Sequence, residues 1–185
     1  MVEIPFYLVE TAFAAVWLAA RIVLWILRGW IDWKREAVLL LMYVNLAVLI
    51  RFTFFPMDRA DGRVQPLVFD AAAAFPFKIN LVPLVKLLDY DSRRDLLLNT
   101  IGNAAMFVPT GIVLPVVYRR LDTFGKVLAA GAGISLCIEL LQLPFSVRTS
   151  DVDDLLLNIL GVIAGYGIYA AVRTLKKGKR SIRKR

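Results

Sequence analysis

Five long apolar segments, separated by short polar stretches, constrain what this chain can fold into. They cover roughly residues 4–27, 37–57, 96–117, 127–145 and 155–172. A helix of about 20 apolar residues crosses the hydrocarbon core of a bilayer, which is about 30 Å thick. Backbone polar groups in lipid must be satisfied within the segment itself, which favours helices. The sequence therefore predicts an all-α membrane protein, a polytopic bundle of five transmembrane helices.

Composition supports this class and excludes several kinds of chemistry. Hydrophobic residues make up 59% of the 185 residues, more than a soluble core of this size needs. The chain has no histidine, and its one cysteine, Cys137, lies within an apolar segment. Disulfide scaffolds, zinc sites of cysteine and histidine, and histidine-based acid–base catalysis are therefore excluded. We expect no cofactor except a divalent cation held by carboxylates.

Lysine and arginine predict the orientation. More of the 23 basic residues fall on the side of the membrane that carries the C-terminus. The positive-inside rule then places the N-terminus outside and the C-terminus in the cytoplasm. Much of the bias comes from the tail KKGKRSIRKR, which could bind nucleic acid. After five spans we interpret it instead as an anchor on anionic lipid headgroups, with no nucleic-acid partner.

With this orientation, the polar residues that interrupt the apolar segments fall mostly toward the outer face. A charge at mid-bilayer costs about 2.5–3.5 kcal/mol on insertion scales. We therefore expect Arg51 and Glu139 to face each other or water rather than lipid. Three segments each carry a polar stripe at helical spacing. The stripes comprise Asn99 and Asn103; Ser135, Glu139 and Gln142; and Asp151, Asp154 and Asn158.

Small residues predict where helices pack closely. Gly161 and Gly165 form a G-x-x-x-G motif in phase with Asn158, which allows a neighbouring backbone to approach. In the first segment, Glu10 and Arg21 lie near opposite ends, so we expect each side chain to extend to the headgroups at its own end.

The segment 58–95 is predicted to lie at the outer surface. Its first part mixes charges with glycine and proline and is expected to be a loop. In its second part, apolar residues recur at helical spacing after Asn80, a candidate N-cap, which predicts an interfacial helix between the second and third spans. These apolar residues are Leu81, Leu84, Val85 and Leu88.

Four motifs in series carry a resemblance to a known family. They are NLVPL at 80–84, NTIGNAAMFVPTG at 99–111, SLCIELLQ at 135–142 and RTSDVDDLLLNILG at 148–161. In their order along the chain and in their residues, these motifs resemble the VanZ-like family of bacterial membrane proteins. The resemblance covers roughly 45–167. It picks out Arg51, Pro56, Asn80, Pro83, Asn99, Gly102, Asn103, Pro109, Gly111, Glu139, Gln142, Arg148, Asp151, Asp154, Asn158 and Gly161.

The resemblance implies a four-helix family core in a bacterial cell membrane. Residues 1–34 would then be an additional N-terminal transmembrane helix, 35–175 the VanZ-like membrane domain and 176–185 a basic cytoplasmic tail. Founding members of the family are associated with resistance to teicoplanin-type glycopeptide antibiotics. The resemblance makes a link to such resistance an expectation for this chain.

The first functional hypothesis is a non-enzymatic envelope protein. Its outward-facing polar pocket would bind a lipid-linked or cell-wall-related ligand, or a partner protein. Arg51 and Arg148 would hold a phosphate or carboxylate through forked hydrogen bonds, and amide side chains would supply neutral donors and acceptors. The candidate ligand-binding residues are Arg51, Asn80, Asn99, Asn103, Glu139, Gln142, Arg148, Asp151, Asp154 and Asn158.

The alternative is a membrane-embedded, metal-dependent enzyme acting on a lipid-linked substrate. Glu139, Asp151 and Asp154 could bind a divalent cation through oxygen ligands. Glu139 is the candidate catalytic residue, as a general base. No nucleophile is marked, since Ser135 has no recognisable activating partner.

Each polar residue also has a purely structural interpretation. Aspartates in the first turn of a helix meet the positive end of its dipole, and Ser150-x-x-Asp153 has the form of a capping box. Asparagines within helices can serve as interhelical hydrogen bonds, worth about 0.6 kcal/mol on average. The gathering of such residues at one face of the membrane nevertheless favours a site.

Overall fold

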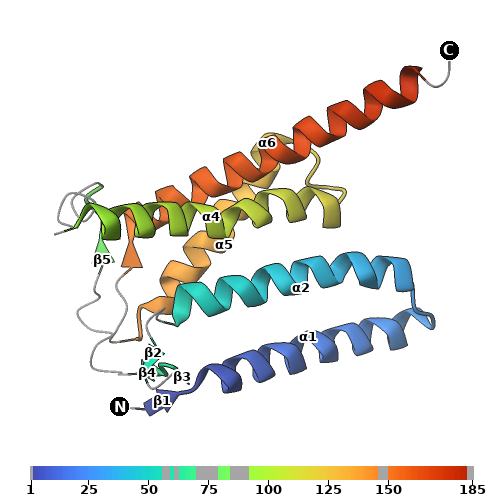
Figure 1. The fold of residues 1–185 in the computed structure, drawn as a ribbon. Coiled ribbons are helices and arrows are strands. Elements are labelled where there is room, and N and C mark those ends of the chain that lie inside the picture. The colour runs from blue at the N-terminus through green and yellow to red at the C-terminus, as the bar shows by residue number, and fades with distance from the viewer. Residues whose placement is uncertain are drawn as a thin grey trace. The chain divides into compact units, whose positions relative to one another are not determined.

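The computed structural model describes residues 2–55, 59–60, 63–69, 79–83, 92–145 and 150–182. Within these residues, five helices are long and apolar enough to cross a membrane, which confirms the predicted fold class (Figure 1). The predicted interfacial helix falls mostly on residues outside the described ranges. The five helices are α1 (Phe6–Arg28), α2 (Trp33–Phe54), α4 (Arg93–Val117), α5 (Phe124–Gln142) and α6 (Val152–Ile182).

Local capping explains where several helices begin and end. Gly29 ends α1 in the left-handed region at φ 73°, a conformation that glycine adopts without steric cost. Asp32 caps α2 by accepting a hydrogen bond from the Arg35 backbone N at 3.0 Å. Ser92 accepts one from Arg94 N at 3.2 Å at the start of α4. These caps place the starts of α2 and α4 a few residues before their apolar segments.

The chain divides into two compact units. The first unit comprises residues 1–82 and 137–152, and the second comprises 83–136 and 153–185. The helix α5 therefore contributes its C-terminal end to the first unit and the rest to the second. Each unit has its own packing.

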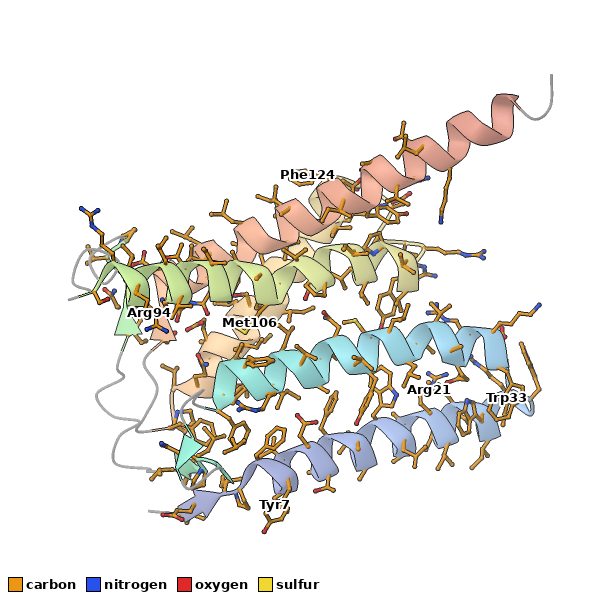
Figure 2. All side chains as sticks on the ribbon, viewed as in Figure 1. Tyr7, Arg21, Trp33, Arg94, Met106 and Phe124 are labelled. Atoms are coloured by element: carbon orange, nitrogen blue, oxygen red, sulfur yellow. The ribbon has the colours of Figure 1, made fainter. Side chains whose placement is uncertain are left out.

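In the first unit, α1 and α2 form an antiparallel pair. Phe6 packs edge-on against Phe55 with centroids 5.2 Å apart, and Phe13 stacks on Tyr43 at 5.2 Å. At the other end of the pair, Arg21 forms an ion pair with Glu36 through both carboxylate oxygens. Figure 2 shows Arg21 between the two helices. Our expectation that Arg21 extends to the headgroups is therefore corrected, because a charged partner on α2 lies within reach.

One face of α1 is left for lipid. None of its residues is buried, although the helix is strongly apolar. Tyr7 points away from α2 in Figure 2 and is 72% exposed. By contrast, α2 buries a stripe at helical spacing. The stripe comprises Leu39, Met42, Asn45, Leu49 and Thr53.

Short strands join the segments at the ends of the helices in the first unit. In antiparallel pairs, β1 (Val2–Ile4) lies beside β4 (Leu67–Phe69), and β2 (Arg59–Ala60) beside β3 (Arg63–Val64). A parallel pair joins β5 (Ile79–Asn80) to β6 (Ser150–Asp151). None of these strands was predicted from the sequence. Each has only two or three residues, too few to show an alternating pattern.

In the second unit, α4 and α6 run in the same direction with their backbones in contact. A Cβ placed on Gly161 would clash with the carbonyl oxygen of Ala104, and one on Gly165 would clash with that of Val108. Gly111 on α4 faces Gly165 in turn. The predicted close approach at the G-x-x-x-G motif is thereby confirmed, and α4 is its partner. The helix α4 continues through Pro109 and Pro115 to Val117.

Adding one methyl group at this contact should be costly. We expect Gly165→Ala to destabilise the protein by about 1–3 kcal/mol, because the new Cβ meets rigid backbone rather than a flexible side chain. Gly167→Ala on the same helix is the matched control, since its Cβ would meet open space. Thermal unfolding in detergent, with size-exclusion chromatography as the readout, gives the melting temperature of each variant. Equal melting temperatures for both variants would contradict the close contact.

Candidate functional site

In the first unit, a buried carboxylate of α5 accepts a hydrogen bond from the backbone of β6. Glu139, from α5, is 4% exposed and Asp151, from β6, is 2% exposed. The backbone N of Asp151 donates a hydrogen bond to Glu139 Oε2 at 3.0 Å. A buried carboxylate needs such donors, because an isolated charge away from water is strongly disfavoured. The start of the final span is thus tied to the end of α5.

Asn80 completes this group from the strand β5. The parallel pairing places Asn80 opposite Asp151, and Asn80 Nδ2 donates to Asp151 Oδ1 at 3.2 Å. Asn80 Oδ1 accepts from the backbone N of Val82 at 3.2 Å, a local turn that asparagine commonly stabilises. Three predicted site residues, distant in sequence, are therefore joined. We call Asn80, Glu139 and Asp151 the carboxylate cluster.

Gln142 makes a second connection in the same unit. Its Nε2 donates to the backbone oxygen of Thr53 at 2.5 Å, and Gln142 is 6% exposed. Thr53 O is among the last four carbonyls of α2, which have no partner within the helix. Thr53 Oγ1 in turn donates to Leu49 O at 2.7 Å. A side chain of α5 therefore satisfies the end of α2.

Arg51 lies against aromatic rings near the end of α2. Its guanidinium carbon is 5.5 Å from the ring centroid of Phe6 and 5.4 Å from that of Phe52, the range of cation–π contacts. Arg51 Nη1 donates to Phe55 O at 3.3 Å. Its predicted pairing with Glu139 stays a prediction, and Arg148 lies outside the described residues.

A separate polar group lies in the second unit. Asn103 Nδ2, on α4, donates to Asp154 Oδ1 at the start of α6. Asn158 Nδ2 donates to Ser135 Oγ at 2.9 Å, and these two residues are 3% and 0% exposed. Asn99 is half-buried on the first turns of α4. Each of the two hydrogen bonds joins α6 to a different neighbour.

The start of α6 differs from the predicted capping box. The helix begins at Val152, so Ser150 lies two residues before its first turn. Asp153 and Asp154 lie in the first turn, where negative charge is favoured by the helix dipole. Ser150 is instead extended in β6. Pairing with β5 accounts for the shift, because it holds Ser150 and Asp151 in a strand.

The predicted residues thus fall into two groups, one in each unit. Arg51, Asn80, Glu139, Gln142 and Asp151 belong to the first unit. Two buried polar residues of α2 were not singled out from the sequence, although both share the spacing of its buried stripe. A polar residue at a core position is the signal that could have found them. The predicted residues in the second unit are Asn99, Asn103, Asp154 and Asn158. The two buried polar residues of α2 that were not singled out are Asn45 and Thr53.

No group of three or more acidic, histidine or cysteine side chains in the described parts of the chain could hold a metal ion. The Glu139 oxygen that faces Asp151 accepts a backbone N–H, and Asp154 accepts from Asn103. Binding of a divalent cation by Glu139, Asp151 and Asp154 stays a prediction.

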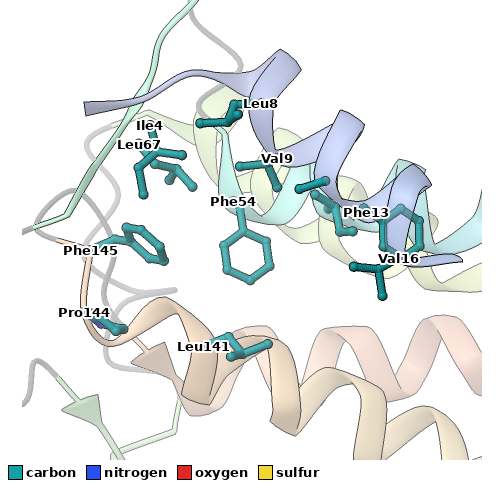
Figure 3. A pocket seen from close by; sticks show the side chains of 12 residues that line it. Ile4, Leu8, Val9, Phe13, Val16, Phe54, Leu67, Leu141, Pro144 and Phe145 are labelled. Atoms are coloured by element: carbon teal, nitrogen blue, oxygen red, sulfur yellow. The ribbon is translucent and has the colours of Figure 1, made fainter. Parts of the chain in front are cut away.

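The first unit also contains an apolar cavity of about 650 Å³. In Figure 3, side chains of α1, of the end of α2 and of the segment that follows α5 surround it. The lining is almost wholly hydrocarbon, and each of these three segments contributes an aromatic ring. The lining residues include Leu8, Phe13, Ile50, Phe54, Leu141 and Phe145.

Five apolar helices, with polar side chains joined to one another and to backbone groups, define a multi-pass membrane protein. The family described as VanZ/LLP1 matches residues 39–173, most of the chain, and the protein belongs to this family. The match begins after α1. No curated protein and no solved structure matches the chain.

The buried Ser135–Asn158 hydrogen bond can be tested by a double-mutant cycle. Asn158→Leu should destabilise the protein by about 1–3 kcal/mol, because Ser135 Oγ stays buried without its donor. Adding Ser135→Ala should recover part of that loss, with a coupling of about 0.5–1.5 kcal/mol. Unfolding in mixed micelles with increasing denaturing detergent gives the four stabilities. Strictly additive losses would show that the two side chains act independently.

Proposed function

We propose that this VanZ/LLP1 protein is a non-enzymatic envelope protein that binds a lipid-linked, cell-wall-related ligand in its first unit. The observation that carries the proposal is the apolar cavity of about 650 Å³. Its volume lies within the range of small-molecule sites, and its lining suits a hydrocarbon chain. In a multi-pass membrane protein such a chain is within reach of the cavity.

Arg51 is the proposed contact for the ligand's phosphate. It follows Ile50, which lines the cavity, and its guanidinium stacks on Phe6, between the lining residues Ile4 and Leu8. A guanidinium carries five N–H donors, so it can bind phosphate while it keeps its bond to Phe55 O. A hydrocarbon chain in the cavity would therefore bring its phosphate to a fixed cation.

The polar residues beside the cavity suit the remainder of such a ligand. Gln142 follows the lining residue Leu141, and Thr53 precedes the lining residue Phe54. Under the predicted orientation, the C-terminal ends of α2 and α5 face the exterior, where lipid-linked cell-wall precursors are consumed. A protein that holds such a precursor would alter how glycopeptide antibiotics gain access to it. Membership in the VanZ/LLP1 family supports that link.

Filling the cavity should displace the ligand. Ala12 lines the cavity, so Ala12→Trp is expected to reduce the amount of lipid-linked ligand that co-purifies, by roughly tenfold or more for a lost steric fit. Ala15→Trp, on the same helix but not in the lining, is the control and should retain the ligand. Native mass spectrometry of the purified proteins gives the bound mass and its occupancy. Equal occupancy in both variants would contradict the proposed site.

Removing the positive charge of Arg51 tests the proposed phosphate contact and the proposed cellular role together. We expect the wild-type chain to raise the minimal inhibitory concentration of teicoplanin in a susceptible Gram-positive host. Arg51→Gln should abolish this effect and lower ligand occupancy, because the neutral amide loses the charge-assisted bonds. Lys34→Gln, which removes the same charge at the exposed start of α2, should preserve both. An Arg51→Gln variant that binds and protects like the wild type would refute the assignment of Arg51.

A further inference from the structure

We propose that the second unit carries a separate site for an anionic phospholipid, in a cavity of about 420 Å³ beside Arg173 and Lys176. The site uses none of the residues assigned to the cell-wall ligand. Residues of α4 and α6 line the cavity, and the lining has an apolar part and a polar part. Ile112, Val116, Ile168 and Val172 supply the apolar part, and Tyr169, Arg173 and Lys176 supply the polar part.

The position of these residues along their helices places the cavity at a membrane surface. The membrane-spanning part of α4 ends at Val117, and that of α6 ends at Lys176. An α-helix rises 1.5 Å per residue, so Ile168 lies about 12 Å deeper along α6 than Lys176. The basic groups therefore lie at headgroup level and the apolar groups beneath them. A phospholipid has the same order of charge and hydrocarbon along its length.

The polar part is suited to a phosphodiester. Arg173 offers a planar fork of N–H donors and Lys176 a mobile ammonium group. Tyr169 adds a hydroxyl and packs against Tyr166, with ring centroids 5.9 Å apart. Basic pockets between membrane helices bind anionic headgroups in this way, and each basic residue near the surface adds about fivefold in affinity. Charge and apolar contact together select an anionic lipid over a zwitterionic one and over free phosphate.

A nearby carboxylate is already engaged elsewhere. Asp122 accepts a hydrogen bond from Lys126 Nζ at 2.8 Å. This bond holds the pKa of Asp122 below its usual range, and the charge of Arg173 contributes a smaller effect in the same direction. Lys126 is therefore the main partner of Asp122, and Arg173 has the weaker interaction with this carboxylate.

Lipid competition on the full chain tests the proposal. The protein is placed in nanodiscs made of equal parts phosphatidylglycerol and phosphatidylcholine, and the retained lipids are identified by native mass spectrometry. We expect the wild type to retain phosphatidylglycerol preferentially. The double variant Arg173→Gln with Lys176→Gln should lower this preference by roughly 30-fold, the product of two basic contacts. Arg119→Gln with Arg120→Gln, which removes the same charge from an exposed turn outside the lining, should leave it unchanged.

A second pair of variants tests the apolar part. Ile168→Trp should fill the cavity and reduce retention of phosphatidylglycerol, whereas Ile163→Trp, exposed on the same helix but outside the lining, should not. These two variants also keep the test decisive if the double glutamine variant is not monodisperse on size exclusion. Soluble glycerol phosphate should compete poorly, because it lacks the chain that the apolar wall binds.

Three outcomes would overturn the proposal. They are no preference for phosphatidylglycerol in the wild type, an equal loss in both double variants, and full displacement of the lipid by glycerol phosphate. The Ala12→Trp variant separates this site from the cell-wall ligand, since it should lose that ligand and keep the phosphatidylglycerol preference. Loss of the preference in Ala12→Trp would also count against a separate site.

Discussion

The contact between α4 and α6 is the constraint on which the second unit depends. At Gly111, Gly161 and Gly165, no side chain separates the two backbones, so the helices lie closer than ordinary side chains allow. Van der Waals contact, rather than the hydrophobic effect, drives such packing in lipid, because lipid tails are as apolar as the side chains they would replace. The same closeness brings Asn103 within reach of Asp154. Steric contact and polar pairing therefore reinforce each other.

In the first unit, the polar side chains join segments that are distant in the sequence. Glu139 receives a backbone N–H and Gln142 donates to a helix-end carbonyl. Both interactions satisfy backbone groups at places where a helix or strand begins or ends, where lipid offers no partner. The polar residues thereby make irregular backbone tolerable at the membrane boundary. The apolar cavity in the same unit has room for a ligand.

Hydropathy and helical spacing were sufficient to predict the five spans, the G-x-x-x-G contact and several members of each polar group. These features are local, since each depends on residues within one helix. The strand pair that joins Asn80 to Asp151, the Arg21–Glu36 ion pair and the apolar cavity were not predicted. All three depend on which segments lie side by side, and the residue pattern within one segment does not show that. Ser150 illustrates the difference, because its local pattern favoured a cap while strand pairing made it extended.

The length of α6 has a mechanical consequence. Its 31 residues extend about 46 Å, well beyond the hydrocarbon core of about 30 Å. A straight rod longer than the layer it crosses must lean or protrude. Its first turn contains acidic residues and its C-terminal part contains basic ones, so one helix has opposite charges at its two ends. A tilt of this single helix would change the depth of both charged ends in the membrane.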